Sequence, residues 1–248
     1  MYGWRGKSGI VIPSNNVVLE SELGQLLPSG MTAHYSRVLA TGSDPDALLT
    51  MSTEADRAID ELDATHVDVF LYACVSTSLV RGPAWDDEFG TRTTSRTGRP
   101  CFTAAEASAQ AIRAVGAPNV GLVTPFPTDI HRLVPLFLAE WGIDVTAHAT
   151  HDISDIDEVC LRDPGETYRL ARSLVGEFDA VLILATDLRT IDVIEALEQD
   201  MGVPVVTTNQ ALAWMAMKSL GVRAPRENYG ALLADLPDLI ETASPAHH

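Results

Sequence analysis

One cysteine of this chain stands where an apolar run gives way to hydroxyl residues, in the stretch from Asp68 to Leu79 (DVFLYACVSTSL). The apolar part predicts a buried strand, and the serines and threonine that follow are typical of a helix start. A thiol at such a junction can act as a nucleophile or a proton carrier, because a helix dipole lowers the pKa of a thiol at its N-terminus. The alternative is a buried, inert cysteine. Its place beside Ser76 and Ser78 favours chemistry, so we predict Cys74 as the catalytic residue.

A similar run returns from Asp179 to Thr190 (DAVLILATDLRT), with Ala185 in the position of the cysteine. Thr186 is predicted to bind a carboxylate through its backbone N–H and its hydroxyl. Asp187 is predicted first as a cap for a helix from Leu188 to Met201, and second as a base that faces the substrate. Because only the first of the two runs carries a thiol, the pattern suggests an asymmetric cysteine enzyme.

Other predicted binding residues follow the ends of strands. Val75 and Ser76 offer N–H groups and a hydroxyl that would hold a carboxylate and stabilise an enediolate. Asn15 and Asn16 follow a strand and Pro13, and one of the two amides would donate to a substrate carboxylate, with an ordinary turn as the alternative. Phe126, in the later loop that mirrors the one after Pro13, offers no donor.

Composition excludes several classes of function. The formal charge of −17 argues against nucleic-acid binding and against docking on anionic lipid, which both need clustered Lys and Arg. Three cysteines without paired spacing fit a reducing compartment, and no His or Cys spacing suggests a metal. The absence of a long apolar run or of a leader-like start makes a cytoplasmic protein the expectation. Cys101 is predicted in a core strand and Cys160 in a loop, both without a catalytic role.

Strands alternate with helices along the whole chain, which predicts an α/β fold with parallel sheets and right-handed crossovers. We expect strands at 8–12 and 67–73, and helices at 46–63 and 104–115. The fold of residues 83–99 cannot be predicted from their sequence.

The pattern then restarts, because residues 119–125 resemble 9–13 and residues 202–207 resemble 98–103. Three matched segments in one order predict two similar Rossmann-like halves related by a pseudo-twofold axis. The expected domains are residues 1–117 together with 208–248, and residues 118–207. Since ligands bind beyond the carboxyl ends of parallel strands, the active site is expected in the cleft between the halves.

These residues resemble the aspartate/glutamate racemase superfamily, and within it the maleate cis-trans isomerases and the arylmalonate decarboxylases. The opening Tyr2 to Gly6, the segment Ile12 to Asn16 and the later Leu188 to Thr190 are similar to the isomerases. The segment Ser76 to Gly82 and Tyr229-Gly230 are similar to the decarboxylases.

The resemblance implies an enzyme without a cofactor, which acts on a small carboxylate and forms homo-oligomers. In the isomerases a thiolate at the position of Cys74 adds to the double bond of maleate, and Asn16 matches a substrate-binding amide. The chain departs from the family at Ala185, which aligns with the second cysteine, at Phe126, where a tyrosine is usual, and at Ile156, where an asparagine is usual. Racemisation by two opposed thiols is therefore not available.

Three functions stay open. The first is a maleate isomerase-like enzyme in which the Cys74 thiolate adds to the double bond. The second is an arylmalonate decarboxylase-like lyase in which Cys74 protonates an enediolate, which the apolar Phe126 and Ile156 favour. The third is a non-catalytic protein that binds a small carboxylate.

Overall fold

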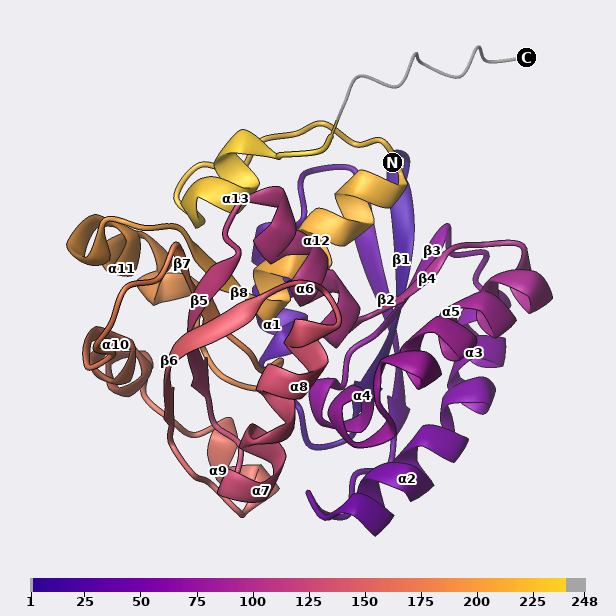
Figure 1. The fold of residues 1–248 in the computed structure, drawn as a ribbon. Helices are drawn as coiled ribbons and strands as arrows, with labels where there is room; N and C mark the ends of the chain where they lie inside the picture. Colours follow the sequence, from indigo (N-terminus) through magenta and orange to yellow (C-terminus); the bar gives the residue numbers. More distant parts are fainter. Residues whose placement is uncertain (1, 240–248) are drawn as a thin grey trace.

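The computed structural model describes residues 2–239, which form two parallel four-stranded sheets with helices packed on them (Figure 1). The first sheet has the strand order β2-β1-β3-β4 and the second has the order β6-β5-β7-β8. The four strands of each half therefore follow the same order in their sheet. This confirms the predicted α/β fold of two similar halves with parallel sheets.

The elements of the first sheet and its helices are β1 (Gly6–Pro13), α1 (Leu19–Leu26), β2 (Met31–Val38), α2 (Pro45–Thr53), α3 (Ala55–Asp63), β3 (Val69–Tyr72), α4 (Val75–Arg81), α5 (Pro83–Thr97), β4 (Cys101–Thr103) and α6 (Ala104–Ala114). Those that follow are β5 (Asn119–Thr124), α7 (Thr128–His131), α8 (Leu133–Ala139), β6 (Asp144–Thr150), α9 (Ile156–Val159), α10 (Pro164–Arg172), β7 (Ala180–Ile183), the 3₁₀ helix η1 (Ile191–Val193), α11 (Ile194–Met201), β8 (Val205–Thr207), α12 (Thr208–Ser219) and α13 (Gly230–Asp235).

Strand register places the two predicted active-site junctions at equivalent positions. Tyr72 of β3 pairs with Val11 of β1, and Ile183 of β7 pairs with Val123 of β5. Each strand is continued by one further backbone hydrogen bond to the same neighbour, of 2.8 Å in the first half and 2.9 Å in the second. Cys74 and Ala185 are both the second residue after their strand, so the internal repeat aligns them in space as well as in sequence.

A glycine in the first strand of each half lets the side chain of a loop residue pack directly on the sheet. A Cβ on Gly9 of β1 would come within 2.9 Å of the Val67 side chain, and one on Gly121 of β5 would come within 2.9 Å of Leu174. Neither position has room for a methyl group without a shift of its neighbour. The two halves thus share a packing constraint as well as a strand order.

Helix α12 follows β8 but packs against α1 and α6, which belong to the first sheet (Figure 1). Its residues from Thr208 to Met217 are all buried. Thr207 caps the helix, accepting a hydrogen bond from the N–H of Gln210 while the Gln210 amide oxygen accepts the Thr207 N–H. The division into residues 1–117 with 208–248 and residues 118–207 remains our proposal for the domains, and its last part, 240–248, lies outside the described residues.

One predicted helix differs from the structure, and one segment without a predicted fold proves to be helical. The expected helix at 46–63 is divided into α2 and α3 at Glu54, which ends the first and precedes the second. Residues 83–99, for which no fold could be given, contain α5. Pro83 at its first turn and Gly98 in the left-handed conformation at its end are the signals that define its bounds.

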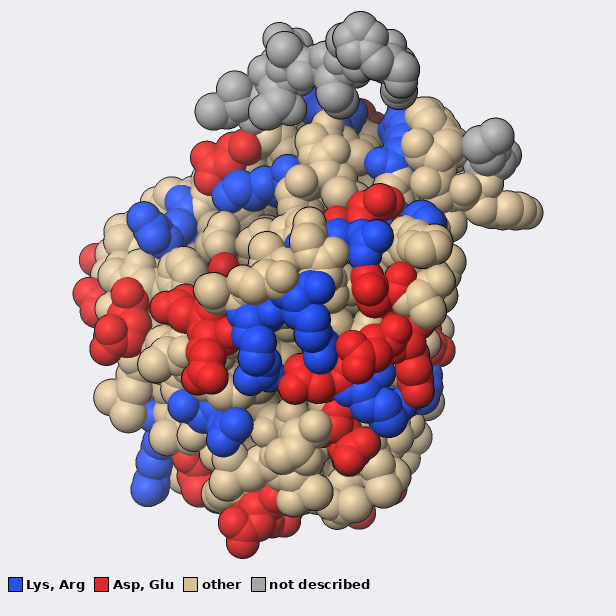
Figure 2. Space-filling view, turned by 90° about the vertical axis from the view of Figure 1, so that its right-hand side faces the viewer, with Lys and Arg blue, Asp and Glu red and all other residues tan. Residues whose placement is uncertain are grey.

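Charges on the outer face of the first half are interleaved rather than separated (Figure 2). Arg92 and Arg96 of α5 lie 3.3 Å and 3.6 Å from the Asp56 carboxylate of α3, and Arg57 of α3 contacts Glu61 at 2.6 Å. All of these groups are exposed to solvent, so each pair adds little stability. Because the arginines are paired with acids, this face offers no basic patch to an anionic partner.

Candidate active site

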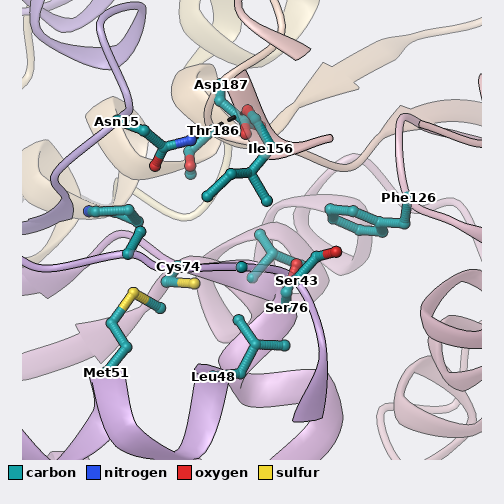
Figure 3. A pocket seen from close by; sticks show the side chains of 14 residues that line it. Asn15, Ser43, Leu48, Met51, Cys74, Ser76, Phe126, Ile156, Thr186 and Asp187 are labelled. Atoms are coloured by element: carbon teal, nitrogen blue, oxygen red, sulfur yellow. Dashed lines mark hydrogen bonds between the residues drawn. The ribbon is translucent and has the colours of Figure 1, made fainter. Parts of the chain in front are cut away.

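The carboxyl ends of β1, β3, β5 and β7 meet at a cavity of about 60 Å³ that residues of both halves line (Figure 3). Such a volume has room for a few water molecules or a small organic acid. Six of the predicted site residues are in its wall: Cys74, Val75, Ser76, Phe126, Thr186 and Asp187. The other lining residues are Pro13, Asn15, Ala40, Gly42, Ser43, Leu48, Met51 and Ile156.

Cys74 is extended and immediately precedes α4, so it is the N-cap residue of that helix. Its side chain is 7% exposed. The Thr77 hydroxyl donates to the Cys74 sulfur across 3.2 Å, and the Tyr72 hydroxyl donates to Thr77 across 3.3 Å. Trp85 and Phe89 of α5 pack on the Tyr72 ring with centroid distances of 5.5 Å and 5.1 Å. The aromatic cluster fixes the donor chain that ends on the sulfur.

The expected lowering of the thiol pKa is outweighed by burial. Burial raises the pKa of Cys74 to about 11, and the charge of Asp187 raises it further. The Thr77 hydroxyl and the N–H groups of Thr77 and Ser76 act in the opposite direction, but they do not compensate for the loss of water. Cys74 is therefore a protonated thiol at neutral pH, already surrounded by the donors that a thiolate needs.

Alkylation measures this property directly. At pH 7 iodoacetamide should modify Cys74 about 100-fold more slowly than an unperturbed thiol, since its pKa lies about two units higher. The rate should rise about tenfold with each pH unit up to about pH 10. Peptide mapping would follow the modified residue, with Cys74→Ser as the blank. A rate that levels off near pH 8 would contradict the raised pKa.

Thr186 is held by the first half of the protein. Its hydroxyl donates to the Ala73 carbonyl across 3.2 Å and accepts from the Asn16 amide across 3.0 Å. The prediction that this hydroxyl donates to a substrate carboxylate is therefore corrected, because its hydrogen already bonds the Ala73 carbonyl of the first half. The backbone of Thr186 remains in the cavity wall.

The structure separates the two neighbouring asparagines. Asn16 is 1% exposed and does not line the cavity, because its amide bonds Thr186 and its oxygen accepts the N–H groups of Val18 and Leu19. Asn15 lines the cavity instead, and its amide donates to the Ile156 carbonyl across 3.1 Å. The binding role of Asn16 stays a prediction, and the structure gives it a second role as a link between the halves.

The prediction that Asp187 caps a helix beginning at Leu188 is wrong. Regular helix begins only with η1, and neither η1 nor α11 has a side-chain cap of its own. Asp187 lines the cavity, and burial raises its pKa to about 6.

A residue that the sequence did not single out replaces that cap. Glu22 of α1 is 4% exposed and accepts the N–H groups of Thr190 and Ile191 across 2.6 Å and 3.2 Å. The Asn209 amide of α12 donates to the same carboxylate and to the Thr186 carbonyl, across 2.7 Å and 3.1 Å. Glu22 thus fixes the segment that carries Thr186 and Asp187.

One side of the cavity is apolar. Leu48 and Met51 come from α2, Phe126 from the loop after β5, and Ile156 from the start of α9. Phe126 is 9% exposed, and no lysine, arginine or histidine is among the described residues of the wall. A ligand here meets backbone N–H groups and hydroxyls on one side and hydrocarbon on the other.

The described residues also bear on metal binding and on membrane insertion. Within residues 2–239 no group of three or more His, Cys, Asp or Glu side chains is placed to hold a metal ion. No described helix is both long and apolar enough to span a membrane.

Comparison with known proteins agrees with this geometry. The sequence profile of a family described as arylmalonate decarboxylase matches residues 38–233. The maleate isomerase of Geobacillus stearothermophilus is 28% identical over 241 residues, which cover 91% of this chain and 96% of that protein.

Two solved structures extend the comparison. The maleate isomerase of Pseudomonas putida S16, as a cysteine-to-alanine variant with maleate, superposes with a TM-score of 0.89 and 26% identity, over 94% of this chain and 99% of that one. A cysteine-to-serine variant of the Nocardia farcinica maleate cis-trans isomerase, with a covalently bound succinylcysteine intermediate, gives a TM-score of 0.88 and 26% identity, over 93% and 98%.

Proposed function

Because the chain belongs to the arylmalonate decarboxylase family, we propose that it is a cysteine enzyme without a cofactor that converts maleate, or a close relative, into the trans isomer. The observation that carries the proposal is the single thiol, Cys74, in a cavity at the carboxyl ends of the strands. The similarity to maleate isomerases over nearly the whole chain supports the same reaction.

The proposed chemistry begins when the Cys74 thiolate attacks one alkene carbon. A carbon–sulfur bond forms, and the π electron pair moves to the neighbouring carbon and its carboxylate, as an enediolate. Rotation about the new single bond is then free, and expulsion of the thiolate restores the double bond in the trans form. The succinylcysteine of the Nocardia farcinica enzyme supports addition of this kind.

The cavity wall supports distinct binding roles for the surrounding residues. Val75 and Ser76 begin α4, where backbone N–H groups lack intrahelical partners, and would hold the carboxylate nearer the thiol. Thr186 and Asp187 would define the other end of the substrate from the second half, and Asn16 would act from behind them through its hydrogen bond to Thr186. Phe126 would pack on the carbon chain.

Proton NMR of the purified protein with maleate tests the proposal. Growth of the fumarate signal at the expense of maleate, absent from buffer without protein, is the expected result. Unchanged maleate would contradict the isomerase.

A decarboxylase is the second candidate, since the apolar wall of Leu48, Met51, Phe126 and Ile156 suits an aryl group. A thiol of pKa about 11 is also a proton donor at neutral pH, as protonation of an enediolate requires. Release of CO₂ from phenylmalonate would support it. Binding of both acids in calorimetry without turnover would indicate the third candidate, a carboxylate-binding protein.

A cytoplasmic location and a homo-oligomeric state are part of the same proposal. Three free, buried cysteines are consistent with a reducing compartment. Light scattering coupled to gel filtration would measure the molar mass, and one equal to the 26.7 kDa of a single chain would contradict the oligomer.

A further inference from the structure

Asp187 is a cavity carboxylate that the fold itself does not use. It caps neither η1 nor α11, because Glu22 bonds the N–H groups at that helix start. Among residues 2–239 no other residue donates a hydrogen bond to its side chain or lies within ion-pair distance of it. A partly buried carboxylate without a structural partner usually has a ligand to meet.

Its place in the wall suits proton transfer. In Figure 3 Cys74 lies on one side of the cavity with Leu48 and Met51, and Asp187 lies on the opposite side with Thr186. A planar alkene between these walls presents one face to the sulfur and the other to the carboxyl group. Nucleophile and proton donor would then approach from opposite faces.

Among the described residues that the second half contributes to the cavity wall, no other side chain can transfer a proton in this way. Ala185 occupies the position equivalent to Cys74 and cannot carry a proton, and the described lining residues include just two titratable side chains, Cys74 and Asp187. Burial raises the pKa of Asp187 from 3.8 to about 6, which brings it closer to neutral pH, where a group can both accept and give a proton.

We propose that Asp187 is the second catalytic residue of the isomerase, which gives a proton to the alkene carbon beside the one that Cys74 attacks and later removes a proton from that same carbon. The inference rests on the proposed isomerase function. It assigns to a carboxyl group, two residues after Ala185, the proton transfer that a second thiol would otherwise perform.

A single proton, shared by Cys74 and Asp187, is sufficient for the whole reaction. At neutral pH that proton rests on Cys74 and Asp187 is the carboxylate, and its transfer to Asp187 when the substrate binds generates the thiolate and the acid together. Addition forms the carbon–sulfur bond, and the π pair takes the Asp187 proton, which leaves a thioether and a carboxylate. After rotation, Asp187 removes a hydrogen from the same carbon, the C–H pair forms the double bond, and the thiolate leaves.

Geometry fixes which hydrogen is removed. Three substituents occupy the second carbon: the carboxylate, the original hydrogen and the new hydrogen, the last of which faces Asp187. The rotation that turns the cis acid into the trans acid moves the carboxylate into the place of the original hydrogen. The original hydrogen thereby turns toward Asp187 and is the one removed, so the new hydrogen stays in the product.

Maleate turnover in D₂O tests this directly. Mass spectrometry and NMR of the first few per cent of fumarate should find one deuterium in each molecule. Asp187→Asn should reduce kcat by about 10²- to 10⁴-fold and yield fumarate without deuterium. Asp192→Asn, an exposed acid in η1 outside the cavity, is the matched control and should keep both rate and label. Circular dichroism would verify that each variant is folded.

The outcomes separate the two proposals. Fumarate without deuterium from the unaltered protein would overturn the role of Asp187 and leave the isomerase standing, since the enediolate would then rotate without being protonated. An Asp187→Asn variant that keeps both the kcat of the parent protein and one deuterium in each fumarate would also overturn the role of Asp187. If the unaltered protein forms no fumarate, the isomerase fails and this inference fails with it.

Discussion

Replacement of Cys74 by serine should lower kcat for maleate isomerisation by at least about 10³-fold. Serine keeps the size of the side chain and its contact with Thr77, but an alkoxide is far harder to form than a thiolate and is a poor leaving group. The loss should therefore fall on kcat, while KM changes little because the carboxylate-binding wall is unaltered. Initial rates by fumarate absorbance would measure both parameters.

Cys160→Ser provides the control for this experiment. Cys160 is also a buried free cysteine, at the end of α9, but it is not part of the cavity wall. It should retain the activity of the parent protein. A Cys74→Ser protein that isomerises maleate within tenfold of the parent would refute the nucleophile.

Conformational stability should fall by several kcal/mol between pH 5 and pH 8, the reverse of a protein stabilised by ionised carboxylates. Burial raises the pKa of Asp86 from 3.8 to about 6 and that of Glu106 from 4.5 to about 7. The folded state thus binds these protons more tightly than the unfolded chain does. The stabilisation is complete below the unfolded pKa values and is lost as pH rises through about 6 to 7.

Asp86 accounts for about 3 kcal/mol over the whole range between its unfolded and folded pKa values, and about half of that is lost above pH 5, since its side chain is 3% exposed and its pKa is shifted by about two units. The net charge of −17 acts in the same direction, because repulsion grows as acids ionise. Urea denaturation at several pH values would measure the slope, and Asp86→Asn should flatten it. The Thr103 hydroxyl, 2.6 Å from the carboxylate, can bond an amide equally well. Stability that increases over this range would contradict the shifted values.

The architecture was predictable because its determinants are local and repeated. The alternation of strands and helices predicted the parallel sheets. The two similar runs that contain Cys74 and Ala185 predicted where the cavity lies. Hydroxyl residues after Cys74 marked the start of α4.

The other features depend on contacts that sequence spacing does not encode. Leu48 and Met51 reach the cavity because the chain turns at Glu54 between α2 and α3, and Asn15 faces the ligand space while Asn16 turns away. Glu22 lies 168 residues before its partner Thr190, so no local pattern announces that bond. The raised pKa of Cys74 follows from how deeply the thiol is buried, which only the assembled walls determine.

The crossing of α12 to the first sheet also has a consequence for synthesis on the ribosome. Helices α1 and α6 emerge early, but the buried surface that they share with α12 is completed only after residue 217 has left the exit tunnel. The first four strands cannot finish folding as an independent unit while the rest of the chain is being made. The surface that α1 and α6 share with α12 is therefore covered late in synthesis, and a chain cut short before α12 would expose apolar surface on α1 and α6 to chaperones and proteases.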